Sequence, residues 1–145
     1  MTFPVPVPGL VIRYSYLWRG EYLRGQEEGV KDRPCAVLLA VTDDAGDQKV
    51  MVLPITHTAP SDAAHAVEIP ATTKRRLGLD DNRSWIVVTE ANRFTWPGPD
   101  LRPAKSGDPA SVAYGELPSA LFDQVRDKWL AHFKAQKVRV VVRTE

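Results

Sequence analysis

Several features that mark large classes of protein are rare or absent in this sequence of 145 residues. Cysteine occurs once, as Cys35, so no disulfide can form within the chain and no cysteine pair has metal-ligand spacing. The net charge of +1 gives no general attraction to nucleic acid or anionic lipid. No apolar run approaches the length of a membrane span, and the first residues lack the pattern of a signal peptide. We therefore expect a cytoplasmic protein with no membrane partner.

The common signatures of enzymes are missing as well. The sequence has no phosphate-binding P-loop, no Gly-x-Gly-x-x-Gly fingerprint and no serine nucleophile elbow. Its histidines, His57, His65 and His132, have spacings that match no zinc or iron site. We expect neither a metal nor a cofactor.

The remaining composition is that of an ordinary globular protein, with 43% hydrophobic and 26% charged residues. A chain of this length most simply forms one domain, which we place at residues 1–145. Alternating prolines predict an extended arm at residues 1–8. Residues 137–145 are rich in valine and predict an extra edge strand or a tail.

The most informative stretch is a hairpin in the first half of the chain. Two runs rich in valine and leucine, at residues 35–41 and 50–55, are separated by an Asp/Gly turn at residues 43–47. This pattern predicts neighbouring antiparallel strands that are buried on both faces. Such a hairpin places Arg33, before the first run, near the level of Thr56, after the second.

The other elements complete a protein that is mainly β (α+β). Pro70 and Gly78 have the positions expected at the two ends of a short helix, and a later segment has the apolar spacing of an amphipathic helix. Long connections are predicted at residues 19–32, after the first strand, and at residues 95–113, after the strand at residues 84–94. The predicted strands cover residues 10–18, 35–41, 50–55, 65–69, 84–94 and 137–143, and the predicted helices cover residues 71–77 and 118–136. We expect a small antiparallel barrel or strongly curled sheet with the C-terminal helix packed on it.

Polar residues at the ends of the hairpin strands are candidates for a binding site. Arg33, fixed by the following proline, either is solvated or holds a phosphate through two hydrogen bonds. Strand periodicity puts Thr56 and Thr58 on one face and His57 on the other, where the hydroxyls either cap their own turn or bind a ligand. Pro54 predicts that this end of the strand is irregular or at a sheet edge.

Three further features have two interpretations each. Glu90 is an acid in an apolar strand, where it either forms a salt bridge or lies at the end of the strand, or has a function. The basic run at residues 74–76 either forms a solvated face, which is the commoner case, or a binding site. Trp96 either stacks a nucleobase or anchors its loop against the core.

The order of four short motifs resembles the MazF/PemK (Kid-like) toxins of type II toxin-antitoxin systems. These motifs are Gly9-Leu-Val-Ile, Gly25-Gln-Glu-Glu-Gly29, Arg33-Pro34 and Leu53-Pro-Ile-Thr56. The resemblance implies an SH3-like barrel, a homodimer, and a metal-independent endoribonuclease (an mRNA interferase) that cuts single-stranded RNA and inhibits growth. It also implies a cognate antitoxin as a partner.

The resemblance places the catalytic pair on Arg33 and Thr56, and the acidic catalytic residue that some members use falls on Glu90. RNA cleavage through the ribose 2′-hydroxyl needs a base, an acid and cationic donors to the phosphoryl oxygens. Arg33 suits charge stabilisation, Thr56 suits hydrogen bonding to the phosphate, and either Glu90 or His57 suits the base. The predicted RNA-binding residues are Thr58, His57, Gln26, Lys31, Arg93 and Trp96.

Two departures from the family pattern favour a rival interpretation. Some relatives have a histidine where this chain has Gln26, and an arginine where it has Val88. The rival is a non-catalytic binding protein on the same barrel, or a toxin that acts by protein contact as gyrase poisons do. In a third interpretation, the C-terminal helix and the valine-rich strand form an interaction module.

Overall fold

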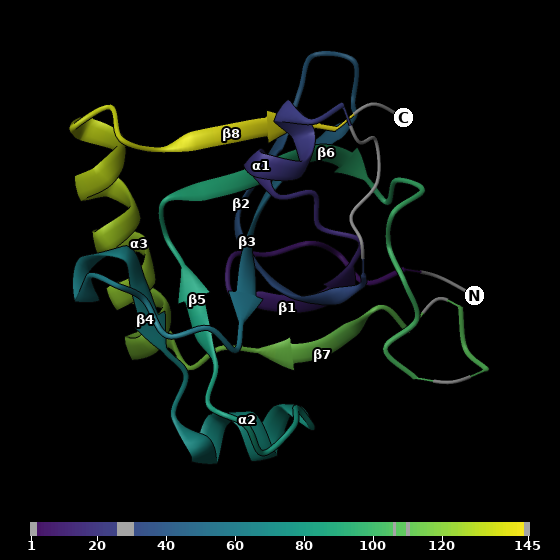
Figure 1. The fold of residues 1–145 in the computed structure, drawn as a ribbon. Coiled ribbons are helices and arrows are strands. Elements are labelled where there is room, and N and C mark those ends of the chain that lie inside the picture. Colours follow the sequence, from purple (N-terminus) through teal and green to yellow (C-terminus); the bar gives the residue numbers. More distant parts are fainter. Residues whose placement is uncertain (1–2, 26–30, 106, 110, 144–145) are drawn as a thin grey trace.

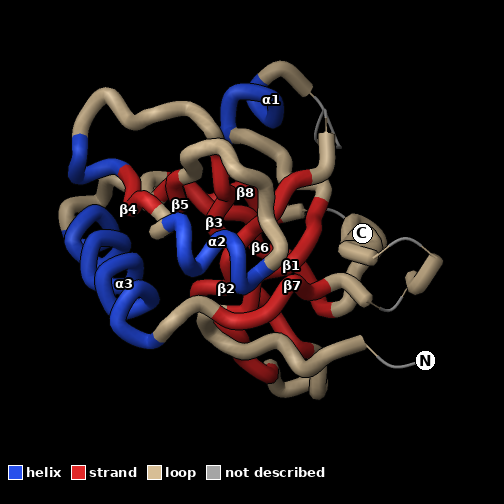
Figure 2. Tube along the Cα trace, turned by 90° about the horizontal axis from the view of Figure 1, so that it is seen from below, coloured by secondary structure: helices blue, strands red, loops and turns tan. Residues whose placement is uncertain are grey.

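The computed structural model describes residues 3–25, 31–105, 107–109 and 111–143. Its strands form one eight-stranded sheet that curls strongly, and the helices lie at its periphery (Figures 1 and 2). The elements are β1 (Leu10–Tyr14), α1 (Arg19–Leu23), β2 (Arg33–Thr42), β3 (Gln48–Thr56), a 3-10 turn η1 (Ala63–His65), β4 (Ala66–Glu68), α2 (Ala71–Leu77), β5 (Trp85–Val87), β6 (Glu90–Trp96), β7 (Ala113–Glu116), α3 (Ser119–Lys134) and β8 (Arg139–Val142).

The predicted fold class is confirmed, because antiparallel strands dominate and the helices are few. The strand order is β4-β5-β3-β2-β1-β7, and β6 pairs with both β3 and β8. The pairing of β6 with β8 is parallel and is a departure from the expected antiparallel arrangement. Among the described residues, no helix is long and apolar enough to cross a membrane.

The predicted hairpin is formed by β2 and β3, with Cys35 opposite Pro54 and Thr42 opposite Gln48. Its turn is closed by Asp43, whose Oδ1 atom accepts hydrogen bonds from the backbone N–H groups of Ala45 (3.0 Å) and Asp47 (2.9 Å). An Asp at the start of a turn forms such bonds readily, which explains why the local sequence specifies the hairpin.

Pro54 lies where β3 exchanges one partner strand for another. β3 pairs with β6 over residues 48–52 and with β5 over residues 55–56, while its pairing with β2 on the other side covers residues 48–54. The prediction that this end is irregular is therefore correct. β3 as a whole is an interior strand, but beyond Pro54 the pairing of the described residues is with β5 alone, so this end of the strand also lies at an edge, as the alternative predicted.

Two hydrophobic clusters fill the two sides of the hairpin. One contains Leu53, Ile86 and the buried residues of α3, and the other contains Tyr14, Val50 and Phe94. In α3, Leu121, Val125 and Trp129 are buried, as its periodicity predicts. Leu130 and Phe133 also belong to the predicted stripe, but they are 40% and 60% exposed. The buried stripe of α3 is therefore narrower than predicted.

Two predicted strands are shorter than expected. The strand predicted at residues 10–18 ends at Tyr14, which lies opposite Arg33, the first residue of β2. Beyond it, the side chain of Asn92 accepts from Leu17 N (2.9 Å) and donates to Leu17 O (2.8 Å). The connection that follows contains the short helix α1, which the sequence did not predict. The strand predicted at residues 84–94 is divided into β5 and β6.

The predicted alternation of the C-terminal strand β8 holds only in its first part. The valines at positions 138, 140 and 142 were expected to alternate against Lys137, Arg139 and Arg143. Val138 and Val140 do pack partly buried against the core, but beyond them Val141 and Arg143 are buried and Val142 is 53% exposed. The guanidinium of Arg143 can be buried because it pairs with Asp100 at 3.0 Å and donates to Ser15 O at 2.6 Å.

Candidate functional site

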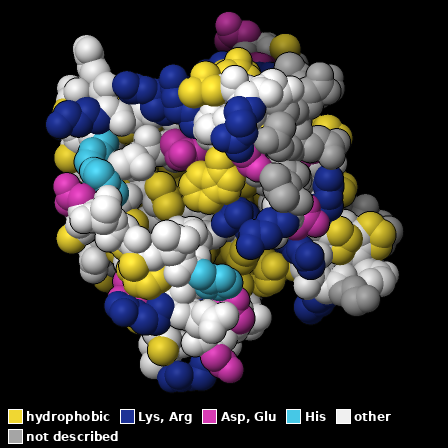
Figure 3. Space-filling view, viewed as in Figure 1, with side chains coloured by type: hydrophobic (Ala, Val, Ile, Leu, Met, Phe, Trp, Pro, Cys, Tyr) yellow, Lys and Arg dark blue, Asp and Glu magenta, His cyan; other side chains and the backbone are white. Residues whose placement is uncertain are grey.

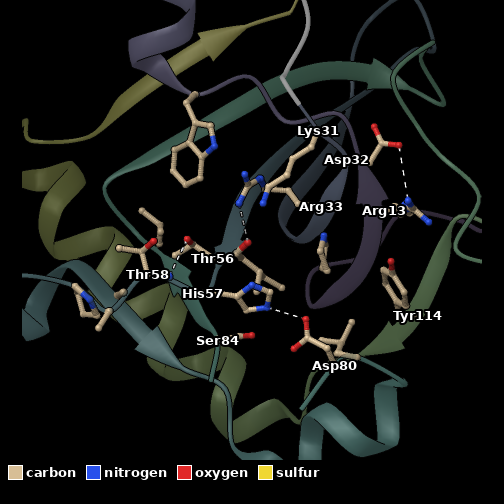
Figure 4. Close-up of a pocket in the computed structure, with 18 of the residues that line it drawn as sticks. Arg13, Lys31, Asp32, Arg33, Thr56, His57, Thr58, Asp80, Ser84 and Tyr114 are labelled. Atoms are coloured by element: carbon tan, nitrogen blue, oxygen red, sulfur yellow. Dashed lines mark hydrogen bonds and ion pairs between the residues drawn. The ribbon is translucent and has the colours of Figure 1, made fainter. Parts of the chain in front are cut away.

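A groove of about 810 Å³ lies where β2 begins and β3 ends (Figure 4). Segments from several parts of the chain contribute to it: β1, the residue before α1, the loop after β3, the turn after α2, and β7. The polar and aromatic residues that line it include Arg13, Trp18, Lys31, Asp32, Arg33, Thr56, His57, Thr58, His65, Asp80, Ser84 and Tyr114.

Arg33 is half-buried and held from two sides. Its Nη1 atom donates to Ile55 O at 3.4 Å, and its Cζ atom lies 4.9 Å from the centroid of the Trp18 ring. Among the described residues, Arg33 has no carboxylate partner, and its buried Nε atom has no hydrogen-bond partner. The guanidinium is thus fixed in place while its charge is not neutralised by a neighbouring acid, as an anion-binding group requires.

Thr56 lines the same groove, as the hairpin register predicts. Its Oγ1 atom accepts a hydrogen bond from Thr58 N at 3.2 Å, which is the turn-capping role weighed as the alternative to ligand binding. A hydroxyl can accept and donate at once, so the Thr56 proton remains available for a ligand oxygen.

His57 and Thr58 line the groove together with Thr56, which corrects the prediction that His57 faces the other side. The strand ends at Thr56, and residues 57–58 form a bend. The alternation of a strand therefore no longer applies to them, and Figure 4 shows the three side chains around the same space.

His57 belongs to a chain of polar contacts that leads into the core. Its Nε2 atom lies 2.7 Å from Asp80 Oδ2, and Asp80 Oδ1 lies 2.7 Å from Lys74 Nζ. Lys74 Nζ also donates to Ser84 Oγ at 2.7 Å and to the carbonyl oxygen of Asn82. The hydrogen bond from Lys74 is the main reason that the pKa of Asp80 is lowered.

The basic run at residues 74–76 is therefore not a solvated face throughout. Lys74 is only 4% exposed, whereas Arg75 and Arg76 are exposed. The ammonium of Lys74 can be buried because all three of its donors have acceptors.

The charges of the groove favour an anionic ligand. Arg13, Lys31 and Arg33 line it, and space-filling shows basic side chains together in the middle of this face (Figure 3). Its two carboxylates are engaged: Asp32 lies 4.0 Å from Arg13 and 3.5 Å from Arg102, and Asp80 is bound as described above. Binding of a phosphodiester backbone requires fixed cationic donors beside hydroxyl groups, and the groove provides both.

Glu90, Arg93 and Trp96 lie outside the residues that line this groove. The Oε1 atom of Glu90 accepts hydrogen bonds from Tyr16 OH and from Arg19 N, each at 3.0 Å, and burial raises the pKa of its carboxyl group. Glu90 is the first residue of β6, so the strand-end location weighed for it is correct, and its partners are hydrogen-bond donors.

Arg93 is exposed on β6, and Trp96 packs its ring 6.1 Å from that of Phe94. Neither residue lines the groove, and nothing in the structure tests their predicted contacts with RNA, which stay predictions. Lys31 does line the groove, and Gln26 lies outside the described residues.

Sequence reasoning missed Trp18 and Asp80 as parts of the site. Trp18 was placed at the end of a strand, and Asp80 was assigned no role. The signals were weak but present: Trp18 precedes a segment that is rich in glycine and charge, and Asp80 follows the glycine that ends α2.

Comparison with known proteins identifies the fold but not the reaction. No family model and no curated protein matches the sequence. A chain of the crystal structure of MazE-MazF (Form-III) from Deinococcus radiodurans matches with a TM-score of 0.58 and 17% sequence identity. The match covers 90% of this chain and 98% of that one.

The structure is thus a curled, mainly antiparallel sheet with an open basic groove at the end of its central hairpin. Among proteins with a curled sheet of this kind, it has the MazF-like fold. The resemblance noted from the four sequence motifs is confirmed at the level of the fold.

Proposed function

We propose that this protein is the toxin of a type II toxin-antitoxin system and that it cleaves single-stranded RNA without a metal. The observation that carries the proposal is the convergence of Arg33 and Thr56 in one open groove, although the two residues come from different strands. The MazF-like fold is consistent with this function.

In the proposed reaction, the ribose 2′-hydroxyl attacks the neighbouring phosphorus atom. The guanidinium of Arg33 stabilises the charge that develops on the phosphoryl oxygens, and the hydroxyl of Thr56 donates a hydrogen bond to the same phosphate. Lys31 and Thr58 contact the RNA backbone along the groove. The products are a 2′,3′-cyclic phosphate and a 5′-hydroxyl.

The proposed partner is an antitoxin whose flexible segment covers the groove that contains Arg33 and Thr56. The matched structure contains MazE together with MazF, which supports a protein partner of this kind. We further propose that the toxin acts in the cytoplasm as a homodimer and inhibits growth by cutting mRNA.

The test is to incubate the purified protein with a long single-stranded RNA in the presence of a chelator and to map the cut ends. We expect cuts that leave 5′-hydroxyl ends, which a polynucleotide kinase can phosphorylate. Arg33→Ala should slow cleavage on the order of a hundred-fold or more, because it removes a donor to the charge of the transition state. Thr56→Val keeps the shape of the side chain and should also slow the reaction.

Arg126→Ala is the matched control, because Arg126 is a partly exposed arginine on α3 outside the groove. An oligonucleotide with a 2′-deoxyribose at the cleavage site should remain whole if the 2′-hydroxyl is the nucleophile. RNA that stays intact but bound would overturn the enzymatic proposal in favour of a non-catalytic binding protein. Cleavage by Arg33→Ala at the rate of the unchanged protein would contradict the assigned site.

A further inference from the structure

The end of β3 carries a contact that the proposed roles of Arg33 and Thr56 do not use. The carboxylate of Asp80 faces the imidazole of His57, with 2.7 Å between Oδ2 and Nε2 (Figure 4). The other oxygen, Oδ1, accepts from Lys74 Nζ at 2.7 Å and from Asn82 N at 3.1 Å. Each oxygen of Asp80 therefore has its own partner, and the carboxylate is held in one orientation.

The position of this carboxylate is set by a helix rather than by a free loop. Lys74 lies on α2 and is 4% exposed, and its ammonium is fixed by Ser84 Oγ as well as by Asp80. Gly78 ends α2 in the left-handed conformation, with φ of 71°, and turns the chain so that Asp80 folds back toward Lys74. A buried cation thus orients an acid that itself contacts His57.

The contact determines which ring nitrogen of neutral His57 carries hydrogen. The lowered pKa of Asp80 keeps its carboxyl group ionised at neutral pH, and an ionised carboxylate only accepts hydrogen bonds. The hydrogen between the two side chains therefore sits on Nε2. The Nδ1 atom keeps its lone pair, and it has no hydrogen-bond partner among the described residues.

We propose that His57 is the general base of the reaction and that Asp80, anchored by Lys74, is the positioning residue that fixes its tautomer. This inference rests on the proposed function. Glu90, the other residue considered as a base, lies outside the groove lining, and its Oε1 atom already accepts two hydrogen bonds.

The proposed step balances without a metal or a further cofactor. His57 Nδ1 takes the proton of the ribose 2′-hydroxyl as that oxygen forms its bond to phosphorus. The bond between phosphorus and O5′ breaks, its electron pair stays on O5′, and O5′ takes a proton from solvent water. His57 returns its proton to solvent, which neutralises the hydroxide formed.

The kinetic test compares His57→Gln and Asp80→Asn with Asp81→Asn, which changes an exposed neighbouring acid outside the groove. We expect His57→Gln to lower kcat by about 10²-fold or more, as loss of a general base does. The Asp80 side chain is 49% exposed, so Asp80→Asn should lower kcat on the order of tenfold, less than the roughly 10⁴-fold seen for a buried triad aspartate. The KM for RNA should change little in either variant. Thermal melting checks that each variant is folded.

Two further measurements separate proton transfer from a structural role. Imidazole added to His57→Ala should restore part of the cleavage rate. Nitrogen NMR at a pH where free histidine is neutral should show His57 with hydrogen on Nε2, and Asp80→Asn should increase the fraction with hydrogen on Nδ1.

The outcomes distinguish this inference from the proposed function. If the unchanged protein cleaves RNA and Arg33→Ala does not, but His57→Gln retains full kcat, the assignment of His57 is overturned and the ribonuclease proposal stands. A dominant Nδ1–H tautomer in the unchanged protein would also overturn the role of Asp80. If the unchanged protein leaves every RNA whole, the proposed function itself fails.

Discussion

The guanidinium of Arg33 lies over the indole ring of Trp18, with 4.9 Å between Cζ and the ring centroid. Trp18 precedes α1 and is only partly exposed, so the ring forms a wall of the groove beside the end of β3. The contact restricts where the guanidinium can point without neutralising its charge. A phosphate can therefore meet an arginine that is already oriented.

Replacement of Trp18 should impair cleavage through Arg33. A cation–π contact contributes about 0.5–2 kcal/mol, which corresponds to roughly 2–30-fold in rate if the orientation is lost in the transition state. We expect Trp18→Ala to lower kcat within this range and Trp18→Phe to lower it less, because a phenyl ring retains part of the interaction. Single-turnover cleavage of a labelled RNA measures both. Equal rates for Trp18→Ala and the unchanged protein would show that the ring does not orient Arg33.

Glu90→Gln should leave the protein at least as stable at neutral pH. Both hydrogen bonds to Glu90 end on Oε1, and the amide oxygen of glutamine can accept them without a buried charge. Burial is the main cause that raises the pKa of Glu90, so the folded state binds its proton more tightly than the unfolded state. The stability that this tighter proton binding provides is fully present below the pKa that Glu90 has in the unfolded state. It is lost as the pH rises through the pKa that Glu90 has in the folded state.

Urea unfolding at mildly acidic and at neutral pH measures this effect. The midpoint of Glu90→Gln, relative to that of the unchanged protein, should be higher at neutral pH than at acidic pH. A lower midpoint at neutral pH would mean that the ionised carboxylate stabilises the fold. RNA cleavage by the same variant tests the catalytic role that the family resemblance implies for Glu90.

Lys74→Met should destabilise the protein by about 1–3 kcal/mol, because it leaves Ser84, Asn82 and Asp80 without their buried donor. Arg75→Met, on the exposed side of the same helix, should change stability by no more than about 0.5 kcal/mol. Denaturant unfolding of the two variants provides the comparison. Equal losses would indicate that the basic run acts as a whole and that the burial of Lys74 has no special effect.

The effect of Lys74 should also depend on pH. The pKa of Asp80 is lowered in the folded protein, so its contribution is present above the unfolded pKa and disappears as the pH falls through the folded pKa. The difference between Lys74→Met and the unchanged protein should therefore shrink in acid. A constant difference down to the lowest pH at which the protein folds would assign the effect of Lys74 to its neutral partners.

The parts of this fold that follow from local patterns were predictable. The hairpin depends on two apolar runs and an Asp/Gly turn, and α2 depends on Pro70 and Gly78, all of which lie within short segments. The approach of Arg33 to Thr56 followed from the hairpin because antiparallel pairing fixes which residues stand opposite each other.

The parts that depend on distant partners were not predictable from the sequence. The burial of Arg143 requires Asp100, and the backbone of Leu17, beyond the end of β1, is bound by the side chain of Asn92. The position of His57 in the groove follows from the bend that ends β3, and no residue pattern marks the place where that bend begins. Sequence periodicity describes a regular strand and cannot report where the strand stops.

Arg143→Met should destabilise the protein strongly, even though it lies close to the end of the chain. The side chains of Arg143 and Asp100 are 1% and 9% exposed, and their ion pair joins the end of β8 to the loop after β6. Removal of one partner of such a buried pair costs about 3–5 kcal/mol, because the remaining charge stays buried.

The control for Arg143 is Arg139→Met, since Arg139 is exposed on the same strand and should contribute less than about 0.5 kcal/mol. In the double variant Arg143→Met/Asp100→Leu, neither charge remains, so part of the lost stability should return. Denaturant unfolding measures all three variants. If Arg143→Met unfolds at the midpoint of the unchanged protein, β8 is an appended strand, as the interaction-module interpretation requires. A large loss that the double variant partly recovers makes β8 a part of the barrel that holds the groove in place.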